Sequence, residues 1–409
     1  MKSRVLVLLI LLAVPAVALA ETGYDAWLRY ARLPDDVVKA DGWIPDAIVV
    51  LDADSAIAQN AGREIERGLR GLLGRELKAA TDWRAQPAIV VSTYARLKAA
   101  APALTPKDSP GTEGYDLVDV IRPAESRRYL VVVGADERGT LYGAFALLRQ
   151  IALGRPVTVP FSTRSAPASL VRWVNQWDNL DGTIERGYGG RSIFWDSGRA
   201  RADLTRVGDY GRLLASVGVQ AVSINNVNAN PAVLKPEMVP DVARIAAALR
   251  PWGVRVALAI DFGSPQSIGL LPTYDPLDPA VAAWWKQTTN RLYDEIPDFA
   301  GFVLKADSEG RVGPSTYGRT HADAANVVAR ALQPHGGLIF YRGFVYDHHM
   351  DWQNPKNDRA RAAYDNFHEL DGKFDANVII QVARAETPDR KSTRLNSSHV
   401  SESRMPSSA

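Results

Sequence analysis

The chain has 409 residues, of which 46% are hydrophobic and 23% are charged, and this composition is typical of a folded protein with two packed domains. It excludes global disorder and a coiled coil. A formal charge of +2 is too small an excess for a nucleic-acid binder that neutralises phosphates. Because there are no cysteines, disulfides, thiolate nucleophiles and Cys-ligated zinc are excluded, and carboxylate and hydroxyl chemistry remains. We predict no cofactor and no metal.

The first 20 residues have the pattern of an export signal. Lys2 and Arg4 precede the apolar run 5–14, and Ala-Leu-Ala at 18–20 is a cleavage pattern. An uncleaved anchor helix is the alternative, but the run is short for a membrane span and Pro15 interrupts it. We expect cleavage after residue 20 and a mature protein without a membrane span, in the periplasm or outside the cell.

Residues 21–160 are predicted to form a small α/β domain. Short apolar runs at 47–51, 88–91 and 129–133 indicate buried strands, and helical periodicity covers 56–73 and 139–153. Pro, Thr and Ser then interrupt the chain between 156 and 165, which favours a domain boundary there.

Residues 161–382 contain a second strand and helix series. The predicted strands are 171–177, 219–225, 254–262, 301–305, 337–342 and 378–382, with helical stretches at 203–217, 240–249, 279–295 and 322–332 between them. The strands are apolar on both faces, as a parallel sheet with crossover helices requires. The regular spacing predicts an incomplete (β/α)8 TIM barrel with about six of its eight strands, and a doubly wound sheet is the alternative.

Most of these strands finish in a polar or charged residue. The strand ends carry Asn175, Trp177, Asn225, Asn226, Asp261, Lys305 and Arg342, and Glu309 follows Lys305 closely. Catalytic residues of a TIM barrel lie where its strands end. No Gly-x-Gly-x-x-Gly follows an early strand and no phosphate-binding loop motif occurs, so a nucleotide-binding sheet is disfavoured.

Three long segments of this region carry a family resemblance. Residues 172–195, 305–319 and 341–347 closely resemble glycoside hydrolase family 67, the microbial α-glucuronidases, and the similarity covers residues 21–382. The resemblance implies an N-terminal α/β domain, a (β/α)8 catalytic barrel and a C-terminal helical region. It also implies release, with inversion, of 4-O-methylglucuronic acid that is α-1,2-linked to the terminal xylose of xylo-oligosaccharides.

The resemblance also implies site residues. Glu309 corresponds to the general acid, Lys305 and Arg342 to residues that bind the sugar carboxylate, and Trp177 to a tryptophan that contacts the sugar. The residue types fit, because a desolvated uronate needs cations and a general acid needs dry or anionic surroundings, to which bound glucuronate would contribute, to stay protonated. The structural alternatives are a solvated loop glutamate, ion pairs at the barrel mouth and a core tryptophan.

The resemblance ends abruptly after Val382. The family continues its sixth strand as Gln-Val-Lys-Asn-Gly-Pro-x-Asp, in which the Asp is assigned to activating water, but here Ala383 and Arg384 follow Val382. Residues 383–409 are Ser-rich and lack periodicity, which predicts a disordered tail foreign to the family. We therefore expect negligible activity from this chain alone, and a homodimer only in a full-length parent.

Two other functions are compatible with the residues. One is a barrel glycosidase of the β-hexosaminidase type, in which an α/β domain also precedes the barrel. The chain lacks the paired Asp-Glu signature of those enzymes, and the cations Lys305 and Arg342 favour an acidic sugar. The other is a non-catalytic carbohydrate-binding protein in which the missing base is genuine.

Overall fold

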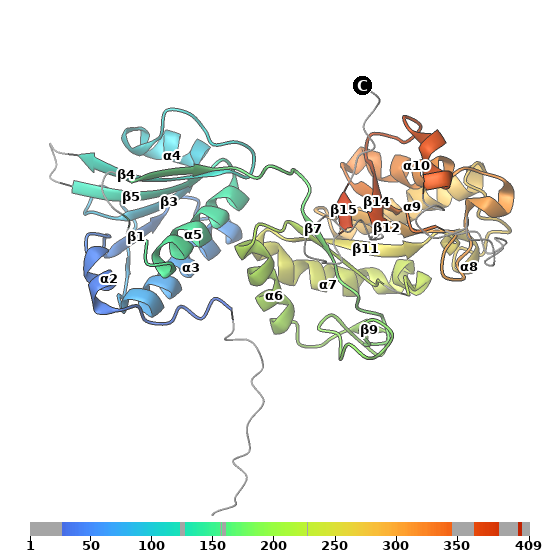
Figure 1. Cartoon of the computed structure of the whole chain (residues 1–409), viewed down its shortest axis with the longest axis horizontal. Coiled ribbons are helices and arrows are strands. Elements are labelled where there is room, and N and C mark those ends of the chain that lie inside the picture. Colours follow the sequence, from blue (N-terminus) through green and yellow to red (C-terminus); the bar gives the residue numbers. More distant parts are fainter. Residues whose placement is uncertain are drawn as a thin grey trace, which may run out of the picture.

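The computed structural model describes residues 27–122, 127–155, 157, 161–226, 228–345 and 364–383, together with the backbone of 400–402. The predicted export signal and most of the predicted tail lie outside these residues. Each of the two lobes in Figure 1 is built around a sheet. Within the described part of the chain, no helix is both long and apolar enough to span a bilayer.

The first sheet has six strands in the order β2-β1-β3-β5-β4-β6. The strands are β1 (Ala47–Val50), β2 (Lys78–Ala79), β3 (Ile89–Thr93), β4 (Tyr115–Arg122), β5 (Arg127–Gly134) and β6 (Ser162–Ser165). The predicted strands β1, β3 and β5 are confirmed and run parallel. The sequence reasoning missed β4, which pairs antiparallel with both β5 and β6. Its apolar residues do not follow a period of two, because Leu117 and Val118 are adjacent and so are Val120 and Ile121.

Helices α3 (Ala56–Leu73) and α5 (Glu137–Ala152) pack together on one face of this sheet, and α4 (Tyr94–Ala100) lies on the other (Figure 1). A short helix, α2 (Asp35–Ala40), precedes β1. The Ser55 side chain caps α3 by accepting a hydrogen bond from the Ala58 amide at 3.2 Å. Gly74 ends the same helix at φ 65°, a conformation that suits glycine. Residues from α3, α5 and the strands form one apolar core.

The second sheet confirms the predicted incomplete barrel. Its strands are β7 (Trp173–Asn175), β10 (Ala221–Ile224), β11 (Arg255–Asp261), β12 (Gly301–Lys305), β13 (Leu338–Arg342) and β14 (Val378–Ala383). These six are parallel neighbours in chain order, which contradicts the doubly wound alternative. Within the predicted tail, β15 (Val400–Glu402) pairs antiparallel with β14. A separate pair, β8 (Trp195–Asp196) and β9 (Arg199–Ala200), lies in the loop after β7.

Helices cover the outer face of the curled sheet. They are α6 (Thr205–Ser216), α7 (Val239–Leu249), α8 (Ser264–Ser267), α9 (Pro279–Glu295) and α10 (His321–Leu332). The 3₁₀ turns are Pro102–Leu104, Pro231–Leu234, Pro236–Met238, Arg250–Trp252, Pro314–Tyr317, Gln333–His335 and His368–Leu370. The main core fills the space between sheet and helices, where Trp285 of α9 packs near Phe302 of β12. A smaller apolar cluster on the inner side includes Phe340 and Trp173, whose ring centroids are 4.7 Å apart.

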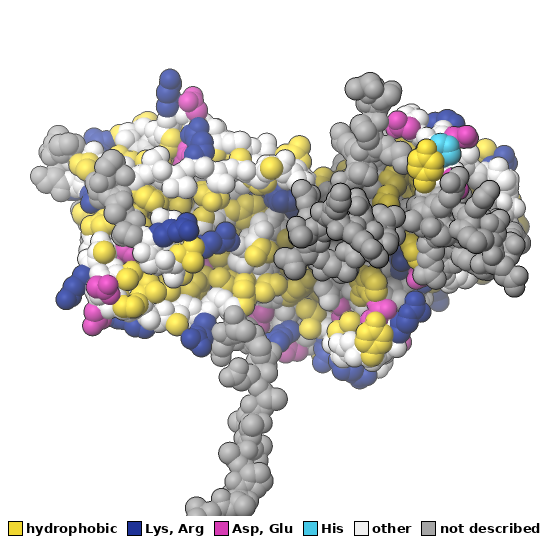
Figure 2. Space-filling model, in the orientation of Figure 1, with side chains coloured by type: hydrophobic (Ala, Val, Ile, Leu, Met, Phe, Trp, Pro, Cys, Tyr) yellow, Lys and Arg dark blue, Asp and Glu magenta, His cyan; other side chains and the backbone are white. Residues whose placement is uncertain are grey.

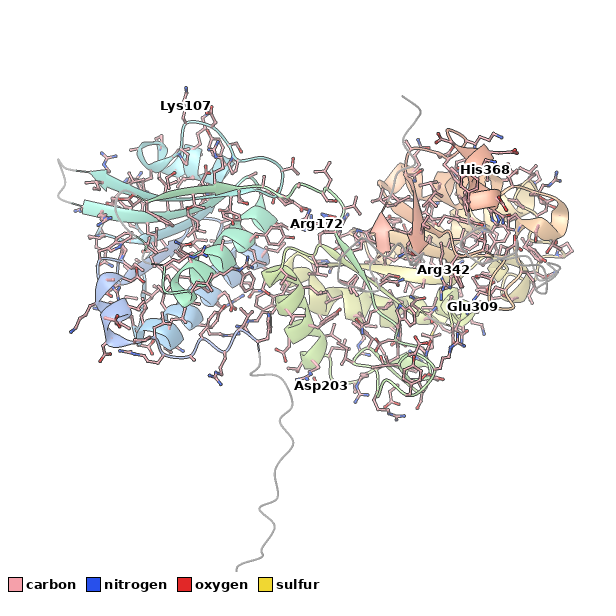
Figure 3. The ribbon with its side chains drawn as sticks, viewed as in Figure 1. Lys107, Arg172, Asp203, Glu309, Arg342 and His368 are labelled. Carbon is pink, nitrogen blue, oxygen red and sulfur yellow. The ribbon has the colours of Figure 1, made fainter. Side chains whose placement is uncertain are left out.

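Buried polar contacts join the two lobes. Glu113 accepts hydrogen bonds from Arg172 and from Gln220 at 3.0 Å, and forms an ion pair with Arg138 at 3.2 Å. Figure 3 shows Arg172 between the lobes. Arg172 and Gln220 immediately precede β7 and β10, so the N-terminal ends of these barrel strands face the first domain. In TIM barrels that end serves stability, and the opposite end is left for chemistry.

Candidate active site

The C-terminal ends of three neighbouring strands carry the charged residues of the candidate site. Asp261 ends β11 and lies opposite Lys305 of β12 in the strand register. Arg342 ends β13, the next strand. Glu309 follows Lys305 in the loop after β12, and Figure 3 shows Glu309 and Arg342 close together in the second lobe. The strand-end pattern of the sequence thus corresponds to one cluster in space.

Glu309 forms an ion pair with Arg342 at the centre of this cluster. Arg342 Nη1 donates to Glu309 Oε2 at 2.8 Å, and both side chains are about three-quarters buried. Arg311 Nη1 lies 3.6 Å from the same oxygen, and Arg186 Nη2 lies 3.5 Å from Oε1. Burial by itself raises the pKa of Glu309, but the Arg342 hydrogen bond and the charges of Arg342, Lys305 and Arg311 outweigh burial and leave that pKa below its ordinary value. Without a ligand, Glu309 is therefore a carboxylate near neutral pH.

Lys305 is buried in the same cluster, with 2% of its surface exposed. Burial, reinforced by the positive charges of Arg342 and Arg311, lowers the pKa of Lys305 to about 7, although Glu309 and Glu185 act in the opposite direction. The ammonium group is thus only partly protonated at neutral pH. An additional anion beside it would favour its charged form.

Two residues of the loop after β12 have a left-handed backbone. Asp307 has φ 45° and Glu309 has φ 54°, a region that non-glycine residues occupy only when their surroundings impose it. Asp307 is the anchor, because its buried carboxylate accepts hydrogen bonds from the Ser315 amide at 3.1 Å and the Ser315 hydroxyl at 2.6 Å. Gly313 lies against the Asp307 carboxylate. The loop therefore holds Glu309 in a defined place.

Gly313→Ala is expected to disturb this loop. An added Cβ would collide with the Asp307 carboxylate, so the anchor must shift, and overpacking of this kind costs about 1–3 kcal/mol of the free energy of unfolding. Urea unfolding measures the change. Gly208→Ala in α6 is the control, because an added Cβ there would lie 3.9 Å from the Ala248 carbonyl oxygen, an ordinary contact, and alanine favours a helix. Equal stabilities of the two variants would contradict the packing argument.

The loop after β7 reaches the cluster from the other side. Trp177 is 45% exposed, and its carbonyl oxygen accepts a hydrogen bond from the Glu185 amide at 2.9 Å. Arg186 bridges Glu185, at 3.6 Å, and Glu309. In Figure 2, dark blue Lys and Arg side chains gather over the part of this loop around β9. The structure thus brings Lys305, Glu309 and Arg342 into one cluster and joins Trp177 to it through the backbone of this loop.

Sequence reasoning missed Arg311 and Arg186. Arg311 contacts Asp261 at 3.4 Å as well as Glu309, so it crosses from the loop after β12 to the end of β11. Its place two residues after Glu309 was the available signal, but loop arginines are usually solvated. Asn225, one of the polar residues at the predicted strand ends, donates a hydrogen bond from its side-chain amide to the Ala259 carbonyl oxygen at 3.0 Å. Among the residues that the structure describes, no three His, Cys, Asp or Glu side chains are grouped as metal ligands would be.

Comparison with known proteins identifies the family. Residues 26–147 match the Glycosyl hydrolase family 67 N-terminus, and residues 154–387 match the Glycosyl hydrolase family 67 middle domain. "Probable alpha-glucuronidase A" of Aspergillus fumigatus is 45% identical over 374 residues, which cover 91% of this chain and 44% of that protein. "Alpha-glucuronidase" of Hypocrea jecorina is 44% identical over 389 residues, which cover 92% of this chain and 45% of that protein. The chain therefore spans less than half the length of these relatives.

A solved structure with a similar arrangement is that of a family GH115 4-O-methyl-alpha-glucuronidase, with a TM-score of 0.48 and 14% identity over 72% of this chain and 39% of that chain. A likeness of this size supports no statement about function. The middle-domain match alone extends over more than half of the chain, and it includes every residue of the cluster. The resemblance drawn from the sequence is confirmed: the chain belongs to glycoside hydrolase family 67.

Proposed function

We propose that this chain forms the N-terminal and middle parts of an α-glucuronidase. That enzyme hydrolyses, with inversion, the α-1,2 bond between 4-O-methylglucuronic acid and xylo-oligosaccharides. The observation that carries the proposal is the cluster of one carboxyl group, Glu309, with the cations Lys305 and Arg342 at the strand ends. The names of the similar proteins support it.

Each residue has a proposed role. Arg342, with its planar fork of donors, and Lys305, with a point charge, bind the sugar carboxylate. The exposed indole of Trp177 contacts the C–H face of the sugar. Glu309 protonates the glycosidic oxygen as the bond breaks. An inverting enzyme also needs a second carboxylate, roughly 6.5–9.5 Å away, that activates water. The family match ends at residue 387, and the aspartate that the resemblance places after Val382 is not there. We therefore propose that the chain alone has negligible activity.

Export accompanies this function. Xylo-oligosaccharides arise outside the cytoplasm, and the first 20 residues have the composition of a cleaved signal. The proposed location is the periplasm or the medium. Mass spectrometry of the protein purified from a secreting host tests this: the mature chain should begin at Glu21, and recovery of an intact N-terminus would contradict it.

A chimera tests the proposed activity. Residues 21–382 are joined to the part of the Hypocrea jecorina relative that follows the aligned segment, and glucuronic acid release from aldotriouronic acid is measured. The chimera is expected to release it, and the present chain is not. Release by the present chain would contradict its proposed inactivity, and a folded chimera that cleaves only N-acetylhexosaminides would contradict the proposed substrate.

Binding of D-glucuronate to the present chain is expected to weaken by about tenfold between pH 6 and pH 8. A carboxylate ligand binds the charged form of Lys305 better, and that form is lost as the pH rises through its pKa of about 7. Isothermal titration calorimetry at the two pH values measures the change. The comparison is made in Glu309→Gln, in which Glu309 cannot titrate. There Lys305→Gln should bind weakly at both pH values, and a tenfold change retained in the double variant would contradict the assignment.

A further inference from the structure

The contacts of Glu309 in the structure conflict with the role proposed for it. A general acid must carry a proton when the glycosidic bond breaks. Arg342 Nη1, at 2.8 Å from Glu309 Oε2, instead stabilises the carboxylate. Arg342 is also the residue proposed to bind the substrate carboxylate. The guanidinium of Arg342 is therefore assigned to two anions, the Glu309 carboxylate and the substrate carboxylate.

Two of the other cations around Glu309 are shared with a second carboxylate. The cations are Lys305, Arg186, Arg311 and Arg342, and the acids besides Glu309 are Glu185 and Asp261. Arg311 forms ion pairs with both Glu309, at 3.6 Å, and Asp261, at 3.4 Å. Arg186 forms ion pairs with both Glu309, at 3.5 Å, and Glu185, at 3.6 Å. The contact between Arg342 and Glu309 is the shortest of these, and it lies on the guanidinium that is proposed to bind the substrate carboxylate.

We propose that the carboxylate of the bound uronic acid replaces Glu309 on Arg342, and that the released Glu309 takes up a proton from solvent. The inference rests on the proposed function. The exchange balances, because one carboxylate leaves the guanidinium as another arrives. Arg342 stays protonated, no covalent bond of the sugar changes, and the proton joins a Glu309 oxygen. The total charge of the cluster is the same before and after.

This exchange makes Arg342 a specificity-determining residue. A neutral sugar that enters the site brings no anion for Arg342, so Glu309 stays ionised and cannot protonate the leaving oxygen. Discrimination against neutral glycosides then arises in the chemical step and adds to any difference in binding. The carboxylate of the substrate thus releases Glu309 from Arg342 and allows Glu309 to become the protonated acid.

Proton uptake on binding tests the exchange with the present chain. D-glucuronate and methyl α-D-glucopyranoside are titrated at pH 5.5 in two buffers of different ionisation enthalpy. Lys305, with its pKa of about 7, is already protonated at pH 5.5 and contributes almost nothing. Glucuronate binding should take up a large fraction of one proton, and any binding of the neutral glycoside should take up none.

Glu309→Gln identifies the group that gains the proton. The variant should bind glucuronate at pH 5.5 without proton uptake. It should also bind about tenfold more tightly than the parent chain for each unit by which Arg342 lowers the pKa of Glu309. Asp203→Asn, an exposed change away from the cluster in Figure 3, should behave as the parent chain. Uptake that persists in Glu309→Gln overturns the exchange, as does parent binding without uptake, while the proposed function survives both. Failure of glucuronate to bind overturns both proposals.

Discussion

Glu309→Gln in the chimera is expected to lower kcat on aldotriouronic acid by about 10²- to 10⁴-fold, the range that one general acid contributes. The xylose oxygen is a poor leaving group, so it needs a proton as the bond breaks. Glutamine keeps the shape of Glu309 and can still accept the Arg342 hydrogen bond, but it cannot supply that proton. The loss should therefore appear in kcat, whereas KM should stay the same or fall.

The leaving group separates acid catalysis from a general disturbance of the site. With 4-nitrophenyl α-D-glucuronide, whose phenolate leaves without protonation, Glu309→Gln should lose much less activity than with aldotriouronic acid. Asp203→Asn is the matched control and should retain parental rates on both substrates, because Asp203 is exposed at the start of α6. An equal loss on both substrates would contradict the acid role of Glu309.

The site could be predicted in part because its residues sit at strand ends. Lys305 and Arg342 are the last residues of β12 and β13, and parallel neighbours bring their ends to one edge. The pattern could not reveal which charges pair. Arg186 comes from the loop after β7 and Arg311 from the loop after β12, and their contacts with Glu309 depend on loop conformations that no local periodicity specifies. The sequence reasoning expected dry or anionic surroundings that raise the pKa of Glu309. In the structure the hydrogen bond from Arg342 and the charges of Lys305 and Arg311 outweigh burial and lower that pKa instead.

The fold was predictable where hydrophobicity is continuous. The helix over Pro279–Glu295 begins at the predicted residue because Asp278 accepts a hydrogen bond from the Ala280 amide and proline suits the first turn. β4 has no such signal, since Asp116 and Asp119 interrupt the apolar residues of Tyr115–Arg122 without a period of two. Its partner β6 is fully exposed and polar, so only its pairing with β4 makes it a strand. These elements depend on tertiary contacts.

Breaking the buried ion pair between the lobes is expected to cost about 3–5 kcal/mol of the free energy of unfolding. Arg212 of α6 and Glu64 of α3 are 4% and 1% exposed, and their atoms approach to 2.6 Å. Glu64→Gln removes the negative charge and leaves the guanidinium, which cannot lose its proton, buried without its carboxylate. Arg212→Met should cost less, because Glu64 retains the Tyr30 hydroxyl donor at 2.6 Å and the Arg67 guanidinium at 3.7 Å.

A double-mutant cycle measured by urea unfolding isolates the pair. The double variant Glu64→Gln/Arg212→Met should lose less free energy of unfolding than the two single variants lose in sum, because neither charge of the pair remains. Asp298→Asn is the matched control: its partner Arg250 lies 2.6 Å away, but the pair is 32% and 45% exposed, so the loss should stay within about 1 kcal/mol. If Glu64→Gln cost no more than Asp298→Asn, burial would not strengthen this contact.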